Sequence, residues 1–174
     1  IMKRLAAVEA LGSVTVIAAD KTGTMTSNEM TVRKIWAAHK IIDVTGTGFN
    51  PEGRFLLNKQ EIDPKNEGAL ENLIKIGELC NDSILKHDKD WHILGDPTEG
   101  ALRVLAAKAG LKYDYKRMDE IPFSSERKKM TTVYNIKEEN IAFSKGGPEI
   151  VLEMCDKIYP NRTLDKEDKE KILK

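Results

Sequence analysis

The stretch MTTVYNIKEENIAFSKGGPE, residues 130–149, predicts a β-hairpin that leads directly into a helix. Met130 to Ile136 and Ile141 to Ser144 are rich in β-branched and aromatic residues, and they are joined by the polar turn KEEN. The run Gly146-Gly147-Pro148-Glu149 is typical of a helix start, since proline is well tolerated in the first helical turn. An antiparallel hairpin next to a helix indicates an α+β fold.

The rest of the chain repeats this alternation of strands and helices. Residues 31–37 and 40–45 could form paired strands, and Trp91 to Leu94 is a further short strand candidate. We therefore expect an antiparallel sheet flanked by helices.

Two helices have recognisable start signals. Asp63-Pro64 and Asp96-Pro97-Thr98-Glu99 each place a capping aspartate before a proline, and Gly110 would end the second helix. The first helix should bury a stripe of mostly apolar residues: Leu70, Leu73, Ile74, Gly77 and Cys80.

The N-terminal part differs from this pattern. Val14 to Ala19 is a short apolar run typical of a fully buried strand in a parallel sheet, and such a strand needs neighbours on both sides. It is followed by DKTGTMT, residues 20–26. A carboxylate at the C-terminal end of a parallel strand lies where open α/β sheets bind ligands, and Asp20 could form an acyl phosphate there. Alternatively, Asp20 could begin an ordinary turn after a strand, with the lysine and threonines merely solvated.

Bulk composition excludes some classes of protein. The 174 residues contain 28 Lys plus Arg and 28 Asp plus Glu, so the neutral total gives no reason to expect nucleic acid as a partner. No apolar run approaches the roughly 20 residues of a membrane span. The two cysteines, Cys80 and Cys155, have no metal-type spacing and are expected to be reduced core thiols. The chain begins with Ile1 and stops in a charged stretch, so we expect a fragment.

Several motifs together resemble one family. DKTGTMT closely resembles the phosphorylation signature of P-type ATPases, usually DKTGTLT, with Met25 in place of Leu. In family-like order follow VTGTGFNPEG (44–53), GDPTEGAL (95–102), PFSSERKKM (122–130) and SKGGPE (144–149), the last resembling KGAPE. The resemblance covers nearly the whole chain and is strongest to the calcium-transporting subgroup.

The resemblance implies a phosphoryl-transfer site at the N-terminus. Asp20 would attack the γ-phosphate of ATP, with Lys21, Thr22 and Thr24 as its neighbours. Mg²⁺ would bind at Asp20 and at the backbone carbonyl of Thr22, together with P-domain residues that this chain lacks. Positioning and charge neutralisation matter most for this chemistry.

The resemblance also implies a nucleotide site in the second part of the chain. Phe123 would stack on adenine, and Lys128 and Lys145 would line the pocket. Glu99 is ambiguous: it could complete the helix cap begun by Asp96, or accept a hydrogen bond from the adenine amino group. The full set of expected nucleotide-binding residues is Glu99, Phe123, Arg127, Lys128, Lys145, Gly146 and Gly147.

The domain expectation follows from these motifs. Residues 1–27 would be the stalk end and the first strand and phosphorylation loop of a haloacid-dehalogenase-like α/β P-domain, and residues 28–174 a truncated nucleotide-binding N-domain. The parent would be an integral membrane cation pump, with this segment on its cytoplasmic side and the rest of the pump as its partner. We expect a monomeric fragment that binds ATP without turnover.

The sequence leaves two other functions open. A soluble haloacid-dehalogenase-like phosphatase would commonly carry a second aspartate two residues after the nucleophile, where this chain has Thr22. A nucleotide-binding or docking module would leave Asp20 without a catalytic role. The transported ion cannot be read from these residues.

Overall fold

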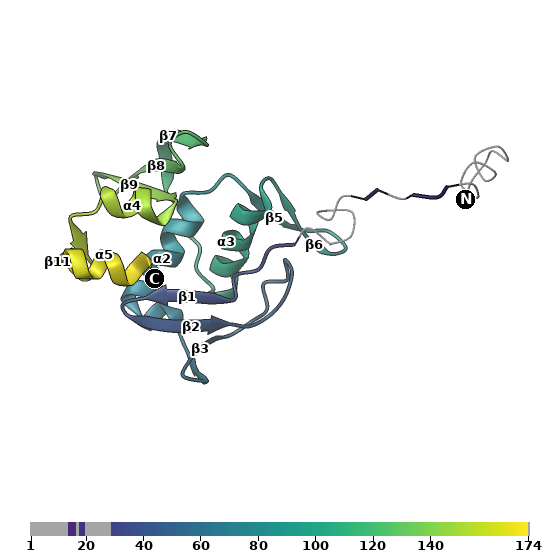
Figure 1. The fold of residues 1–174 in the computed structure, drawn as a ribbon, viewed down its shortest axis with the longest axis horizontal. Coiled ribbons are helices and arrows are strands. Elements are labelled where there is room, and N and C mark those ends of the chain that lie inside the picture. The colour runs from purple at the N-terminus through teal and green to yellow at the C-terminus, as the bar shows by residue number, and fades with distance from the viewer. Residues whose placement is uncertain (1–13, 17, 20–28, 174) are drawn as a thin grey trace.

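A computed structural model describes residues 14–16, 18, 19 and 29–173 (Figure 1). The predicted α+β fold is confirmed, because helices alternate with strands and every strand pair in this part of the chain is antiparallel. The structure does not show the predicted strand at Val14–Ala19: the described residues there form no strand, and Val16 is 78% exposed. The physical reason is that a parallel strand needs flanking partners, and none of the described strands runs parallel to another. The DKTGTMT loop lies outside the described residues.

The first sheet has four strands in the order β1-β2-β3-β4. It confirms the predicted pair and adds a hairpin that the sequence did not suggest, whose second strand is short and polar. Two-residue turns join β1 to β2 and β3 to β4, with positive φ at Asn58 and Lys59 in the second turn. The strands are β1 (Lys34–Ala37), β2 (Lys40–Val44), β3 (Phe55–Leu57) and β4 (Gln60–Ile62).

The first predicted helix is divided in two. Asp63 caps a short 3₁₀ turn, η1 (Pro64–Asn66), and the helix α2 (Gly68–Leu79) begins only after the non-helical Glu67. Four of the five stripe residues are buried, but Leu73 is 38% exposed and its expected burial is wrong. At about 100° per residue, Leu73 lies about 60° around the helix from Leu70 and about 100° from Ile74, which places it at the edge of the buried stripe.

The second predicted helix is confirmed. It is α3 (Pro97–Lys108), and Gly110 follows it with a φ of +59°. A hairpin of β5 (Ile84–His87) and β6 (Trp91–Leu94) connects α2 to α3. Leu102 of α3 packs against α2 at Gly77.

The second sheet has three strands in the order β7-β8-β9. Its predicted hairpin is confirmed as β8 (Lys129–Ile136) and β9 (Glu139–Gly146), which turn at Lys137 and Glu138. The strand β7 (Lys116–Ser124) was not predicted: it contains a proline and several charges, which suit an edge strand. Its pairing with β8 is interrupted twice by register shifts.

The chain then closes with small elements. The predicted third helix is confirmed as the short α4 (Pro148–Glu153), and the charged tail forms α5 (Lys166–Leu173). Between them lies a two-stranded ribbon of β10 (Lys157–Ile158) and β11 (Arg162–Thr163). Within the described part of the chain, no helix combines the length and the apolar character needed to cross a membrane.

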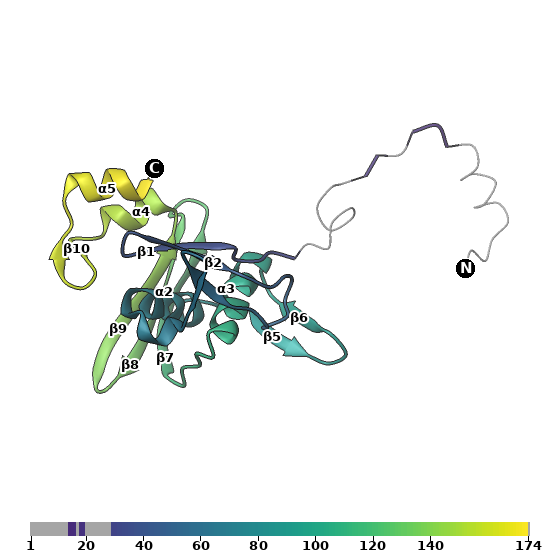
Figure 2. The same cartoon turned by 90° about the horizontal axis from the view of Figure 1, so that it is seen from below.

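The core residues gather around α2, whose place among the strands can be followed in Figure 2. On the first sheet's side, Leu70 and Ile74 pack with apolar residues of β1, β2, β3 and α3. At the C-terminal end of α2, Leu79 packs with Tyr134 and Ile136 of β8. The same helix therefore fixes the first sheet, α3 and the second sheet relative to one another.

The exposed Leu73 provides a matched test of this core. Ile74→Val should lower the free energy of unfolding by about 0.5–1.5 kcal/mol, because Ile74 is 1% exposed and the lost methyl leaves a void. Leu73→Ala removes as many carbon atoms as Ile74→Ala but should cost less, because Leu73 is 38% exposed, whereas roughly 2–5 kcal/mol is expected for Ile74→Ala. Urea denaturation of the three variants measures this, and an equal loss for Leu73→Ala and Ile74→Ala would contradict the assigned helix face.

Candidate functional site

A cavity of about 690 Å³ lies where the start of α3, the segment after α2 and the second sheet meet. Its wall combines apolar side chains with acidic groups and one lysine. The lining residues are Asp82, Asp96, Thr98, Glu99, Leu102, Pro122, Phe123, Met130, Lys145 and Gly146. Four of the predicted nucleotide-binding residues, Glu99, Phe123, Lys145 and Gly146, thus lie around one space.

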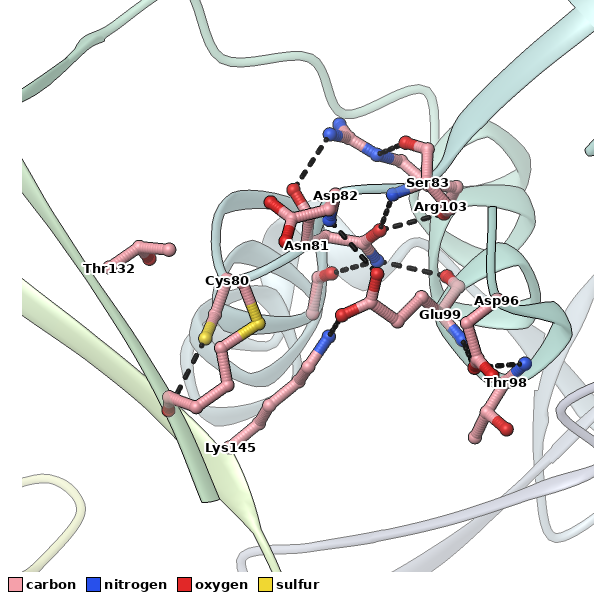
Figure 3. A network of polar contacts seen from close by, with 12 residues as sticks. Cys80, Asn81, Asp82, Ser83, Asp96, Thr98, Glu99, Arg103, Thr132 and Lys145 are labelled. Carbon is pink, nitrogen blue, oxygen red and sulfur yellow. Dashed lines mark hydrogen bonds and ion pairs between the residues drawn. The ribbon is translucent and has the colours of Figure 1, made fainter. Parts of the chain in front are cut away.

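An ion pair between Glu99 and Lys145 lies in this cavity (Figure 3). The Lys145 ammonium on β9 donates to Glu99 Oε1 on α3 at 2.6 Å, and the two side chains are only 21% and 16% exposed. The other oxygen, Glu99 Oε2, accepts from the backbone N–H of Asp82 at 3.0 Å. The carboxylate is therefore held from two sides.

The start of α3 explains why the Glu99 side chain is free to contact Lys145 and Asp82. Asp96 Oδ1 accepts from the backbone N–H groups of Thr98 at 2.8 Å and Glu99 at 3.1 Å, so Asp96 alone provides the side-chain cap. The Glu99 side chain is directed to Lys145 and Asp82 instead of back to Asp96. The sequence left two roles open for Glu99, in the helix cap or in adenine binding. The structure does not form the capping bond from the Glu99 side chain back to Asp96.

Asn81 joins the end of α2 to the start of α3, and sequence reasoning missed it. It is fully buried; its Nδ2 donates to the carbonyls of Gly77 and Glu99, each at 2.9 Å, and its Oδ1 accepts from Ser83 N and Oγ. Every polar atom of its side chain has a partner, as a buried amide requires. The only signal in the sequence was a polar triplet, Asn81-Asp82-Ser83, directly after an apolar helix.

Phe123 provides an aromatic wall. It lies near the end of β7, and it is 59% exposed although it is large and apolar. Pro122, Leu102 and Met130 add apolar surface to the same cavity. A ring face that is open on a cavity can stack against a flat ligand.

The remaining predicted residues do not line the cavity. Arg127 donates from its guanidinium to the carbonyl of Pro122, and Lys128 lies at the β7–β8 turn with a φ of +51°. Gly147 donates its N–H to the Lys128 carbonyl at 2.9 Å. All three are thus close to the strand end that carries Phe123, but outside the space itself.

The two glycines differ in what they require. A Cβ on Gly146 would come within 2.4 Å of the Lys128 carbonyl oxygen, so close strand packing accounts for glycine there. A Cβ on Gly147 would meet its nearest atom at 3.5 Å, an ordinary contact. Alanine is therefore sterically compatible with position 147.

The other predicted group cannot be placed. Asp20, Lys21, Thr22 and Thr24 lie outside the described residues. In the described ranges, no three His, Cys, Asp or Glu side chains are grouped as a metal site would need.

Comparison with known proteins gives consistent matches. The family model for the P-type ATPase cytoplasmic domain N matches residues 69–174. The chain is 40% identical over 166 residues to a calcium-transporting ATPase of Bacillus subtilis, covering 91% of this chain and 19% of that protein. It is 42% identical over 167 residues to the cation-transporting ATPase pma1 of Synechocystis, covering 90% and 18%. Human calcium-transporting ATPase type 2C member 1 is 39% identical over 163 residues, covering 89% and 17%. The chain thus spans about a fifth of the length of these relatives.

A buried cysteine next to a cavity-lining residue yields a test with thiol reagents. Cys80 is fully buried, its Sγ lies 3.6 Å from the carbonyl oxygen of Met130, and burial raises the pKa of its thiol. Since the thiolate is the reactive form, Cys80 should react with a disulfide reagent at pH 8 only in urea, whereas the partly exposed Cys155 should react in the folded chain. A Cys155→Ser variant isolates the slow thiol, and rapid labelling of that variant without denaturant would contradict the packing.

Proposed function

The chain belongs to the P-type ATPases, within their cytoplasmic N domain, and from this premise we propose that its cavity binds the adenine of ATP in a cation-transporting pump. One observation carries the proposal: an exposed aromatic ring and a sheltered carboxylate–ammonium pair face the same space of about 690 Å³. That combination offers a stacking surface together with a donor and an acceptor in the plane of a base.

Phe123 is assigned to the face of the base. Stacking between a base and an aromatic side chain contributes on the order of 1–3 kcal/mol and tolerates any base. The high exposure of the ring leaves its face open for this contact. Stacking alone supplies affinity without selectivity.

Glu99 and Lys145 are assigned to the edge of the base. A carboxylate oxygen has two lone pairs, so each Glu99 oxygen can accept one further hydrogen bond beside its contact with Lys145 or Asp82. Adenine presents an amino donor beside ring-nitrogen acceptors, which suits a carboxylate next to an ammonium. The N–H groups of Lys145 that do not point to Glu99 can reach the ring nitrogens.

Arg127, Lys128, Gly146 and Gly147 are assigned to the margin of the site. Arg127 and Lys128 follow Phe123 at the β7–β8 turn, so their charge is close to a polyphosphate that leaves the base-binding space. Gly146 and Gly147 let the β9 backbone lie against the nucleotide.

We assign the phosphoryl-transfer step to the N-terminal segment. Residues 1–27 would belong to the P-domain and residues 28–174 to the N-domain. An Asp20 carboxylate oxygen would form a bond to the γ-phosphorus as the bond to the bridging oxygen breaks and ADP leaves. Lys21, Thr22 and Thr24 would position the phosphate, and Mg²⁺ held at Asp20 and Thr22 would neutralise its charge.

The setting of this step follows the relatives. Two of those named above are called calcium-transporting, which makes Ca²⁺ the proposed cargo of the parent. The parent would be a membrane protein with this segment on its cytoplasmic side, and its remaining domains would be the partners. The chain on its own is proposed to be a monomer that binds ATP without turnover.

Removing the aromatic ring or the ammonium should weaken nucleotide binding. Phe123→Ala should raise the dissociation constant for ATP by roughly 5- to 150-fold, the equivalent of one stacked base. Lys145→Ala should also weaken binding, because it removes a donor and leaves Glu99 uncompensated. Isothermal titration calorimetry, or amide NMR shifts where affinity is low, measures both.

Two neighbours serve as controls. Ile121 is exposed on the same strand as Phe123 but does not line the cavity, so Ile121→Ala should bind ATP normally. Lys86 on β5 is the control for Lys145: it does not line the cavity, so Lys86→Ala should also bind ATP normally. If Phe123→Ala and Lys145→Ala bind ATP as tightly as these controls, the cavity is not the adenine site.

A substitution at Asp20 should abolish phosphoryl transfer without affecting the binding of the base. Asp20→Asn should leave the ATP affinity of this chain unchanged, while the full-length parent carrying it should form no acid-stable, hydroxylamine-sensitive adduct from γ-labelled ATP. The unmodified parent is the control. An adduct of the same yield in the Asn variant would exclude Asp20 as the acceptor.

A further inference from the structure

Arg117 makes an unusually dense set of contacts for a residue that does not line the cavity. It lies near the start of β7, where its Nε donates to Tyr134 Oη at 3.1 Å and its Nη1 contacts Asp82 Oδ1 and Glu120 Oε2, each at 2.6 Å. Its Nη2 donates to the carbonyls of Asn81 at 2.6 Å and Leu79 at 3.3 Å. The guanidinium thus holds β8 and the segment after α2 at the same time.

The segment that Arg117 holds is the one that orients Glu99. Asp82, which pairs with Arg117 through its carboxylate, donates its backbone N–H to Glu99 Oε2. The neighbouring Asn81, whose carbonyl accepts from Arg117, donates its side-chain amide to the Glu99 carbonyl. Two short chains of hydrogen bonds therefore lead from Arg117 to Glu99.

Arg117 also belongs to the strand that carries Phe123. Within the described residues β7 pairs with one neighbour, β8, and this pairing has register shifts between Arg117 and Asp119 and between Ile121 and Ser124. An edge strand with interrupted pairing is held loosely by its ladder alone. The Arg117 contacts to Leu79, Asn81 and Asp82 give β7 a second attachment, on the side of α2.

The electrostatic state of Arg117 suits this role. Burial by itself would lower its pKa, but hydrogen bonds to Asp82, Tyr134 and Glu120 outweigh burial and raise the pKa above the ordinary arginine value. The group therefore stays charged at all working pH values. Its planar fork can serve several acceptors at once, which the single ammonium of a lysine cannot match.

We infer that Arg117 is a positioning residue for the nucleotide site, which fixes the stacking wall of Phe123 relative to the base-edge acceptor Glu99 and so sets selectivity for adenine. The inference rests on the proposed function. Guanine presents an acceptor where adenine has its amino group, so a firmly held Glu99 rejects guanine, and a loosely held one rejects it less.

The test compares Arg117→Lys with a matched control, Arg103→Lys. Arg103 contacts the same segment, at the Ser83 carbonyl at 2.8 Å and the Asn81 carbonyl at 3.4 Å, and pairs with Glu78. These contacts join α3 to α2 and to the segment after it, and they do not reach β7. Dissociation constants for ATP and GTP are measured by calorimetry or NMR titration, together with thermal unfolding of each variant.

Arg117→Lys should weaken ATP binding by about tenfold, the equivalent of roughly one charged hydrogen bond, and should lower the ratio of GTP to ATP dissociation constants. Arg103→Lys should destabilise the fold while leaving that ratio unchanged. If both variants keep the normal ratio and ATP affinity, Arg117 is merely structural and the inference is wrong.

A second variant covers the case in which Arg117→Lys does not fold. Tyr134→Phe keeps the buried ring but removes the acceptor of Arg117 Nε, together with the hydroxyl's own bond to the Leu79 carbonyl at 2.7 Å. It should lower the same ratio by about threefold. An unchanged ratio there would overturn the inference. Failure of the proposed function gives a different result. In that case the Phe123→Ala variant would bind ATP as tightly as the unmodified chain.

Discussion

The ion pair between Glu99 and Lys145 is the constraint on which the site depends, because it ties α3 to β9 across 46 residues of sequence. Taking a carboxylate and an ammonium out of water costs free energy that their mutual attraction only partly returns, so well-packed apolar residues could hold these elements together as firmly. A sheltered pair at a cavity wall is therefore better explained by what it can bind than by stability. Its oxygens and N–H groups are already desolvated and oriented before a ligand arrives, which reduces the cost of binding.

The surroundings of the pair are built so that few groups near it can rearrange. Asn81 connects α2 to α3 through a fully satisfied buried amide, and Gly77 and Gly100 bring apolar neighbours within contact of the helix backbones. A Cβ on Gly100 would lie 2.6 Å from Ile93 of β6, so the start of α3 is pressed against its preceding hairpin. Rigidity at Glu99 thus comes from backbone packing as well as from hydrogen bonds.

Sequence reasoning succeeded where the signal is local. The Asp96-Pro97 start of α3 and the β8–β9 hairpin each depend on residues a few positions apart, and both are confirmed. It failed where the outcome depends on a distant partner: β7 owes its pairing to β8 in spite of its charges and Pro122. The strand expected at Val14–Ala19 is not shown among the described residues, which include no parallel neighbour for it.

The same division applies to the candidate site. Motif residues Glu99, Phe123, Lys145 and Gly146 could be named in advance and lie around one cavity. Asp82, Asn81 and Arg117 could not, since their contacts join segments 17 to 38 residues apart. Those unpredicted residues decide how sharply the site can discriminate. Phe123 offers any base a face of similar strength, so selectivity has to come from the edge, and an edge group selects only as well as it is held. The discrimination between bases is therefore a property of the tertiary contacts around Glu99, which no motif records.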